Sequence, residues 1–330
     1  MLVTPEGKKH NNLLTVLKSQ QAIAAYALII IYAFFYIKSP SFRSRFTIAS
    51  IFDSSYYAGF LAIGVTFTIA TGGFDLSLGT SMMTSALIGG FLMNNFGIPL
   101  AAALLITILV ATLVGAFNGF LITRLNIVPF VATLGTQMMA KGLGSIITKV
   151  QVQNFPLRDS PDGWYKSIFK STNSFPTGII ILAVIAIAMG IVLNKTKFGR
   201  YILAVGSNSE AARLSGINVK KYQFLAYTLC GFFVGLAAVA YAATYTTILP
   251  GEGAGFELDA IAAAVIGGTS LAGGLASIGG TIIGLFIMTV LKVGLPFINL
   301  QPHYQTFITG LVILIAVYLD VVRRMNKNRA

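Results

Sequence analysis

The side chains that could do chemistry in this chain are few, and most lie inside apolar segments. Asp75 follows the pair Gly72 and Gly73 and precedes an apolar run, so its carboxylate could cap a helix or face a transport pathway. Gln137 lies four residues after Thr133, which places both on one face of a helix. Such groups either bridge helices or line a path for a polar, uncharged solute. The residues predicted to line this path are Thr71, Asp75, Asn118, Thr133 and Gln137.

Other classes of chemistry lack the residues they need. His10 and His303 are far apart and Cys230 is the single cysteine, which leaves no metal-ligand cluster and no disulfide within the chain. No phosphate-binding loop of the G-x-x-x-x-G-K-[ST] type occurs. Glu257 and Asp259 begin a later apolar run, where carboxylates either complement the helix dipole or contact substrate. We therefore expect no catalytic residues, no cofactor, no metal and no ATP hydrolysis in this chain.

One short polar stretch, VGSNSEAARLSGINVKK (205–221), carries its own helix signals. Ser207 and Glu210 have the spacing of a capping box, and Gly216 stands where a left-handed turn would end the helix. Glu210 and Arg213 can pair at i,i+3. A helix of about two turns is unstable alone in water, so we expect it to dock against something.

The elements that position these residues are membrane helices. The chain of 330 residues is 55% hydrophobic and only 10% charged, with a mean hydropathy of +0.80, whereas a soluble domain carries about 25% charged residues. The glycine pairs in GAFNG (115–119), GFFVG (231–235) and GTIIG (280–284) favour helix packing within the chain. We predict an all-α polytopic membrane protein with about ten spans, near 20–37, 56–71, 76–95, 98–122, 128–148, 176–194, 222–246, 256–272, 276–295 and 303–322.

The second and eighth of these runs are short and interrupted by glycine, which indicates broken or partial spans. GGFDLSLG (72–79) and GGTSLAGG (267–274) both read GG-x-x-L-x-x-G, and both fall in these interrupted regions. Paired glycine-broken segments in two halves are typical of a transport pathway. The pattern therefore predicts two repeated halves.

Charge predicts the orientation. If the N-terminus is inside the cell, 14 of the 23 lysine and arginine residues fall in inner segments and 8 in outer ones. The predicted regions are a cytoplasmic tail (1–19), a transmembrane domain (20–322) with an external loop (149–175) and a cytoplasmic loop (195–221), and a cytoplasmic tail (323–330). The net charge of +13 follows from this bias, so no nucleic-acid partner is expected.

Three stretches together resemble one family, the permeases of ABC transporters that import monosaccharides of the ribose, xylose and galactoside type. They are IGVTFTIATGGFDLSLGT (63–80), with Phe74 where the family usually has Ile, FGRYILAVGSNSEAARLSGINVKK (198–221) and GFELDAIAAAVIGGTSLAGG (255–274). The resemblance covers about residues 50–320. It implies a multi-pass protein of the cell (inner) membrane, surrounded by lipid.

The resemblance also implies three protein partners: a cytoplasmic ABC ATPase, a second permease of the same or a sister chain, and an extracytoplasmic sugar-binding protein. The short polar helix then resembles the coupling helix that docks on the ATPase. Ala211 and Ala212 are expected to offer a smooth docking surface, with Leu214 as an apolar contact. The residues expected to serve coupling are Ser207, Asn208, Glu210, Ala211, Ala212, Arg213, Leu214 and Gly216.

Two other classes remain open from the residues alone. A stand-alone secondary transporter or channel for a small polar solute would suit halved organisation and broken helices equally well. An integral-membrane enzyme would need a cluster of titratable or metal-binding residues that the sequence lacks. The identity of the sugar or polyol is also left open.

Overall fold

The computed structural model describes residues 20–169 and 177–327, so the predicted tail 1–19, part of the predicted external loop and the last three residues lie outside it. The first half comprises α2 (Gln20–Lys38), η1 (Pro40–Arg43), α3 (Arg45–Ala70), α4 (Leu78–Phe96), α5 (Leu100–Thr123), α6 (Pro129–Ile147), β1 (Gln153–Asn154), η2 (Gly163–Tyr165) and α7 (Lys166–Phe169). The second comprises α8 (Thr177–Lys195), α9 (Lys197–Ser207), α10 (Ser209–Leu214), α11 (Val219–Tyr245), β2 (Thr247–Ile248), α12 (Phe256–Ile266), α13 (Ile278–Gly294), η3 (Leu295–Ile298) and α14 (Pro302–Lys327). The all-α prediction is confirmed.

A helix lies at each of the ten predicted apolar runs. Within the described ranges, six of them (α2, α3, α5, α8, α11 and α13 with η3) are long and apolar enough to cross a membrane by length and composition alone. The number of ten crossings stays a prediction. The second run was expected to be short, and this is wrong: α3 has 26 residues because the Ser44 side chain accepts a hydrogen bond from the Thr47 amide and starts the helix well before the apolar run. The eighth, α12, is indeed short, at 11 residues.

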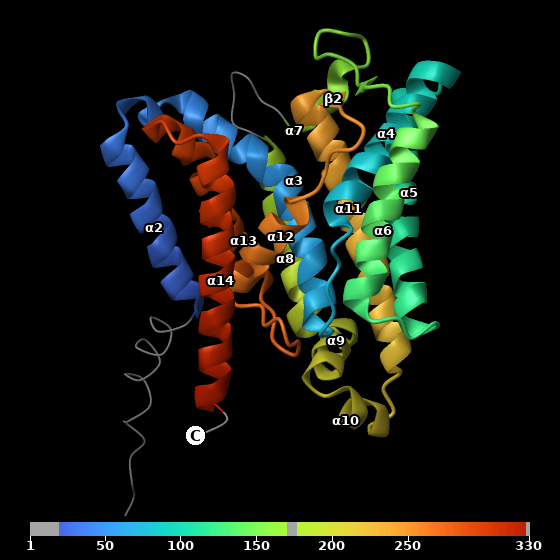
Figure 1. Cartoon of the computed structure of the whole chain (residues 1–330), viewed down its shortest axis with the longest axis vertical. Coiled ribbons are helices and arrows are strands. Elements are labelled where there is room, and N and C mark those ends of the chain that lie inside the picture. Colours follow the sequence, from blue (N-terminus) through green and yellow to red (C-terminus); the bar gives the residue numbers. More distant parts are fainter. Residues whose placement is uncertain (1–19, 170–176, 328–330) are drawn as a thin grey trace, which may run out of the picture.

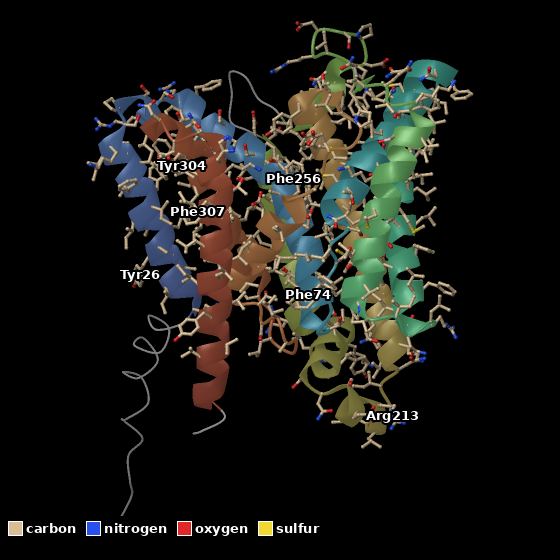
Figure 2. All side chains as sticks on the ribbon, viewed as in Figure 1. Tyr26, Phe74, Arg213, Phe256, Tyr304 and Phe307 are labelled. Carbon is tan, nitrogen blue, oxygen red and sulfur yellow. The ribbon has the colours of Figure 1, made fainter. Side chains whose placement is uncertain are left out.

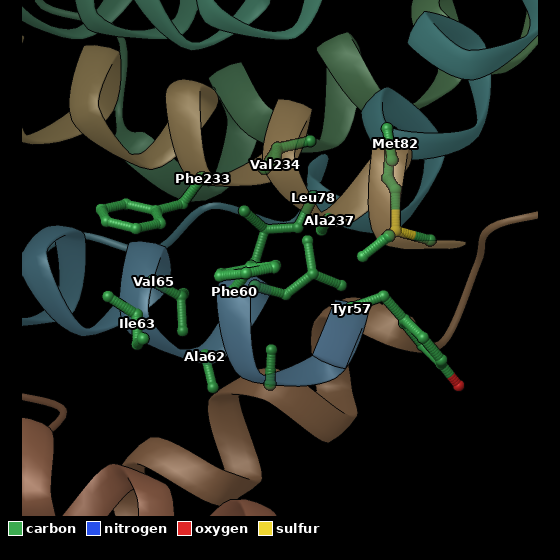
Figure 3. Packing of buried hydrophobic residues seen from close by; sticks show 14 of the residues in the cluster. Tyr57, Phe60, Ala62, Ile63, Val65, Leu78, Met82, Phe233, Val234 and Ala237 are labelled. Atoms are coloured by element: carbon green, nitrogen blue, oxygen red, sulfur yellow. The ribbon is translucent and has the colours of Figure 1, made fainter. Parts of the chain in front are cut away.

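The core lies where α3, α4 and α11 pack together. Figure 3 shows Phe60 and Val65 of α3 facing Leu78 of α4 and Phe233 of α11, all of them buried. Close approach of α11 to α5 depends on glycine, since a methyl group on Gly115 would lie 2.4 Å from a backbone oxygen of α11. The prediction that these glycines pack helices within the chain is confirmed.

The two ends of the molecule differ. The start of α2, the last turns of α14 and the short helix α10 lie at one end, and the strands and α7 lie at the other (Figure 1). At the second end β1 pairs antiparallel with β2, with Gln153 opposite Ile248. The buried Lys166 ammonium lies beneath this pairing and donates to the Ala243 carbonyl at 3.2 Å and to the Thr246 hydroxyl. It thereby satisfies one carbonyl group in the last turn of α11.

Two extended segments enter the bundle from opposite ends. Residues 71–77 rise from the lower end of α3 into the middle before α4 begins, and residues 249–255 descend from the upper end into the middle before α12 begins (Figure 1). The N-termini of α4 and α12 therefore meet inside the molecule. A methyl group on Gly79 would lie 1.9 Å from the Gly253 carbonyl oxygen, which shows how closely the two segments approach.

Candidate functional site

The short polar helix is present as α10, but it starts one residue later than predicted. Ser207 ends α9, and Asn208 is the N-cap of α10: its side-chain oxygen accepts a hydrogen bond from the Ala211 amide at 2.9 Å. The predicted capping box is therefore wrong. Glu210 instead pairs with Arg213 at 2.9 Å, as the i,i+3 spacing predicted.

The C-terminal end of α10 matches the prediction. Gly216 has φ +82°, in the left-handed region that favours glycine. The Gly216 amide donates to the Arg213 carbonyl and the Ile217 amide to the Ala212 carbonyl, both at 3.0 Å, which are the two bonds of a Schellman motif. Two helix ends within eight residues make α10 a rigid, compact projection.

The exposure of the α10 side chains differs from the expectation at Ala212. Ala212 is 5% exposed and packs inward, so it offers no docking surface; Ala211 is exposed, and Leu214 is 81% exposed. Ala212 lies on the face that α10 turns toward α9 and α11, its neighbours in the fold. Figure 2 shows Arg213 projecting from α10 away from the transmembrane helices. An apolar side chain this exposed at the end of a polar helix is a candidate contact for another protein.

The two GG-x-x-L-x-x-G stretches lie against each other and against the last turn of α9, which leads into α10. The Gly274 amide donates to the Ala70 carbonyl at 3.0 Å, and a methyl group on Gly273 would lie 2.7 Å from the Gly72 nitrogen. Gly206, in the last turn of α9, completes the junction, since a methyl group there would lie 1.9 Å from the Ala70 oxygen. One stretch connects α3 to α4 and the other connects α12 to α13, and the two repeated halves stay a prediction. The shared glycines of the two stretches serve a mutual contact.

The structure brings Asp75 and Asn118 together. Asp75 is 2% exposed, and its carboxylate accepts bonds from the Ser77 amide at 2.9 Å and the Ser77 hydroxyl at 2.6 Å. The Asn118 amide nitrogen lies 3.3 Å from both carboxylate oxygens and 2.9 Å from the Ser77 hydroxyl. The Tyr227 hydroxyl donates to the neighbouring Phe74 carbonyl at 2.9 Å. This cluster holds the extended segment before α4 in place.

The other predicted pathway residues are divided between two roles. Thr71 and Thr133 are buried and donate to carbonyls of their own chain segment, Thr68 and Pro129 respectively. Gln137 is partly exposed and donates to the Glu257 carboxylate at 3.1 Å, which joins α6 to the start of α12. Among these three, the side-chain hydrogen bond to a distant helix is the one made by Gln137.

Sequence reasoning gave two residues too little weight. Gly206 was not identified at all, because its role depends on a junction of three segments distant in sequence. Glu257 was interpreted chiefly as a dipole complement, and its contact with Gln137 spans 120 positions. The signal available was the series Gly251, Gly253, Gly255 before it, which indicated an unusually close approach of the backbone.

These helices define a polytopic membrane protein, and comparison with known proteins places it in a family of transport permeases. The model described as "Branched-chain amino acid transport system / permease component" matches residues 47–317. The chain belongs to this family, and it is a multi-pass protein of the inner membrane.

Individual relatives match over nearly their whole length. The ribose import permease protein RbsC of Escherichia coli (strain K12) is 34% identical over 298 residues, 89% of this chain and 91% of that protein. RbsC of Bacillus subtilis (strain 168) is 35% identical over 305 residues, 90% and 91% of the two chains. The galactose/methyl galactoside import permease protein MglC of Escherichia coli (strain K12) is 32% identical over 317 residues, 91% and 94%. No solved structure matches the chain with statistical significance.

Proposed function

We propose that this protein is the permease subunit of an ATP-driven ABC importer that moves a monosaccharide or related polyol into the cell. The relatives are named as import permeases for ribose and for galactose and methyl galactoside. The observation that carries the ATP-driven part is α10, a short helix capped at both ends that exposes Leu214 and directly follows α9, whose last turn packs on the glycine junction. α10 packs against α9 and α11, and Gly206 of α9 touches the backbone of Ala70 and Gly274. A displacement of α10 would therefore pass through α9 to the end of α3 and to the segment after α12.

The proposed partners follow from this arrangement. A cytoplasmic ABC ATPase receives α10 in a groove, with Leu214 and Ala211 at the contact and Ala212 supporting the helix from inside. A second permease subunit, identical or a sister chain, completes the membrane pathway, and an extracytoplasmic binding protein delivers the sugar. Both termini and α10 are cytoplasmic, in accord with the bias of basic residues.

We infer that the pathway passes the centre of the bundle. Gln137 and Thr133 of α6, Asn118 of α5, and Thr71 and Asp75 of the extended segment supply its polar groups. The burial of Thr71, Asp75, Asn118 and Thr133 supports this interpretation, because hydrogen-bonding groups are costly against lipid.

Reconstitution tests the proposal against a stand-alone transporter. The permease, the ATPase and the binding protein that accompany it are placed in proteoliposomes with radiolabelled pentoses, hexoses and polyols. We expect uptake only when ATP and all three proteins are present. Uptake by the permease alone on an ion gradient would contradict the proposal and support a secondary transporter.

A further inference from the structure

The N-termini of α4 and α12 enclose a buried carboxylate at the middle of the molecule. Glu257 lies in the first turn of α12 and is 5% exposed. One of its oxygens, Oε2, lies 2.9 Å from the position of a methyl group on Gly79, in the first turn of α4. Both helices are long enough to carry a dipole, with 19 and 11 residues. Two positive helix ends therefore stabilise a negative charge here.

The two oxygens of Glu257 are used differently. Oε1 accepts hydrogen bonds from the Gly255 amide at 2.9 Å and from the Gln137 amide nitrogen at 3.1 Å. Oε2 is buried and has no hydrogen-bond partner among the described residues. A buried, charged oxygen that accepts no hydrogen bond is costly. Oε2 therefore needs a hydrogen-bond donor that none of the other described residues supplies.

We propose that Oε2 of Glu257 accepts a hydrogen bond from a hydroxyl group of the transported sugar, which makes Glu257 a specificity-determining residue of the pathway. The inference rests on the proposed function and names a contact within it. A sugar hydroxyl is the donor expected for a carboxylate in an importer of neutral, hydroxyl-rich solutes, and such a charge-assisted bond is stronger than a neutral one. The same carboxylate repels anionic sugars such as sugar phosphates.

The position of Glu257 suits a point where a pathway closes. Gly79 and Gly253 touch through their backbones beside the carboxylate, and glycine is required on both sides, since methyl groups there would lie 1.9 and 2.5 Å from the opposing carbonyl oxygens. The segments that meet here come from opposite ends of the molecule (Figure 1). Separating them would open Oε2 to a solute arriving along either segment.

Glu257→Gln isolates the proposed contact from the structural role of this side chain. Glutamine keeps an oxygen that accepts from Gly255 and Gln137, but it places an NH2 donor where Oε2 stands, so a sugar hydroxyl loses its acceptor. Asp259→Asn is the matched control. It removes the same charge from the same helix turn, and Asp259 pairs with Lys292 at 3.3 Å instead of facing Gly79.

The reconstituted complex is assayed for ATP hydrolysis and for uptake of D-ribose and D-galactose, each loaded on the binding protein. We expect Glu257→Gln to keep hydrolysis stimulated by the binding protein while uptake falls about tenfold or more. Asp259→Asn should keep both within about twofold. Monodeoxy analogues that the binding protein accepts give a second readout: the wild type should discriminate against loss of one hydroxyl, and Glu257→Gln should not.

Several outcomes would overturn the inference. These are wild-type uptake by Glu257→Gln, an equal loss of uptake in Asp259→Asn, or unchanged discrimination among the deoxy analogues in Glu257→Gln. A loss of hydrolysis together with uptake would assign Glu257 a structural role and also overturn it. Failure of the proposed function appears separately, as absence of ATP-driven uptake of any sugar by the wild-type complex.

Discussion

Substituting alanine for Gly206 tests whether α9, which carries α10, is held in place by the glycine junction. The added methyl group would lie 1.9 Å from the Ala70 carbonyl oxygen and 2.6 Å from the Gly274 nitrogen, whereas ordinary contact begins at 3.4 Å. These atoms are backbone, and they are the two partners of the hydrogen bond that joins α3 to the segment after α12. No side-chain rotation relieves the overlap, so α9 must shift by more than 1 Å. Overpacking of this kind costs about 3 kcal/mol or more.

Thermal unfolding of the purified permease in detergent measures this cost. We expect the midpoint for Gly206→Ala, at a fixed scan rate, to fall by about 6 °C or more. Gly190→Ala in α8 is the matched control, because a methyl group there meets nothing within 4 Å. Alanine is also the better helix former, so this control should melt at the wild-type temperature or slightly above.

Transport then separates stability from coupling. At a temperature where Gly206→Ala is folded, we expect ATP-driven uptake to be strongly reduced, because α9, which carries α10, no longer packs on the end of α3 in its native position. A Gly206→Ala protein with the melting midpoint and uptake of Gly190→Ala would refute the reasoning.

Three further predictions concern the coupling helix, the buried carboxylate and the topology. Leu214→Asp should leave the melting midpoint unchanged, since this side chain is 81% exposed. It should weaken co-purification of the ATPase about tenfold. Full retention of the ATPase by this variant would show that Leu214 is not part of the contact. Asp75→Ala should destabilise the protein by about 1–3 kcal/mol, because the buried amide and hydroxyl of Ser77 lose their acceptor. Asp75→Asn keeps an acceptor and should lose less stability in the same melting assay. In a cysteine-free background, a cysteine replacing Asp162 should react with an impermeant maleimide added to intact cells, and one replacing Arg213 should not. The reverse pattern would show that the predicted orientation in the membrane is wrong.

Membrane insertion and helix ends were predictable from the sequence because they are local properties. A helix satisfies its backbone hydrogen bonds within itself, so the apolar runs alone indicated α-helical spans and most of their positions. The left-handed turn at Gly216 and the pair between Glu210 and Arg213 likewise depend on residues within a few positions. The prediction of the N-cap failed because two neighbouring residues suit that role. Asn208 is as good an N-cap as Ser207, and α9 continues through Ser207, so Asn208 caps α10.

The tertiary structure decided which face each helix presents and which distant groups meet. Helix rotation about its own axis is set by packing against neighbours, so the sequence did not show that Ala212 turns inward while Leu214 stays exposed. The same holds for the contact of Gln137 with Glu257 across 120 positions. The repeated GG-x-x-L-x-x-G stretches were visible in the sequence, but their role as two sides of one contact was not. That role follows from close backbone approach, which only glycine permits and only the assembled bundle creates.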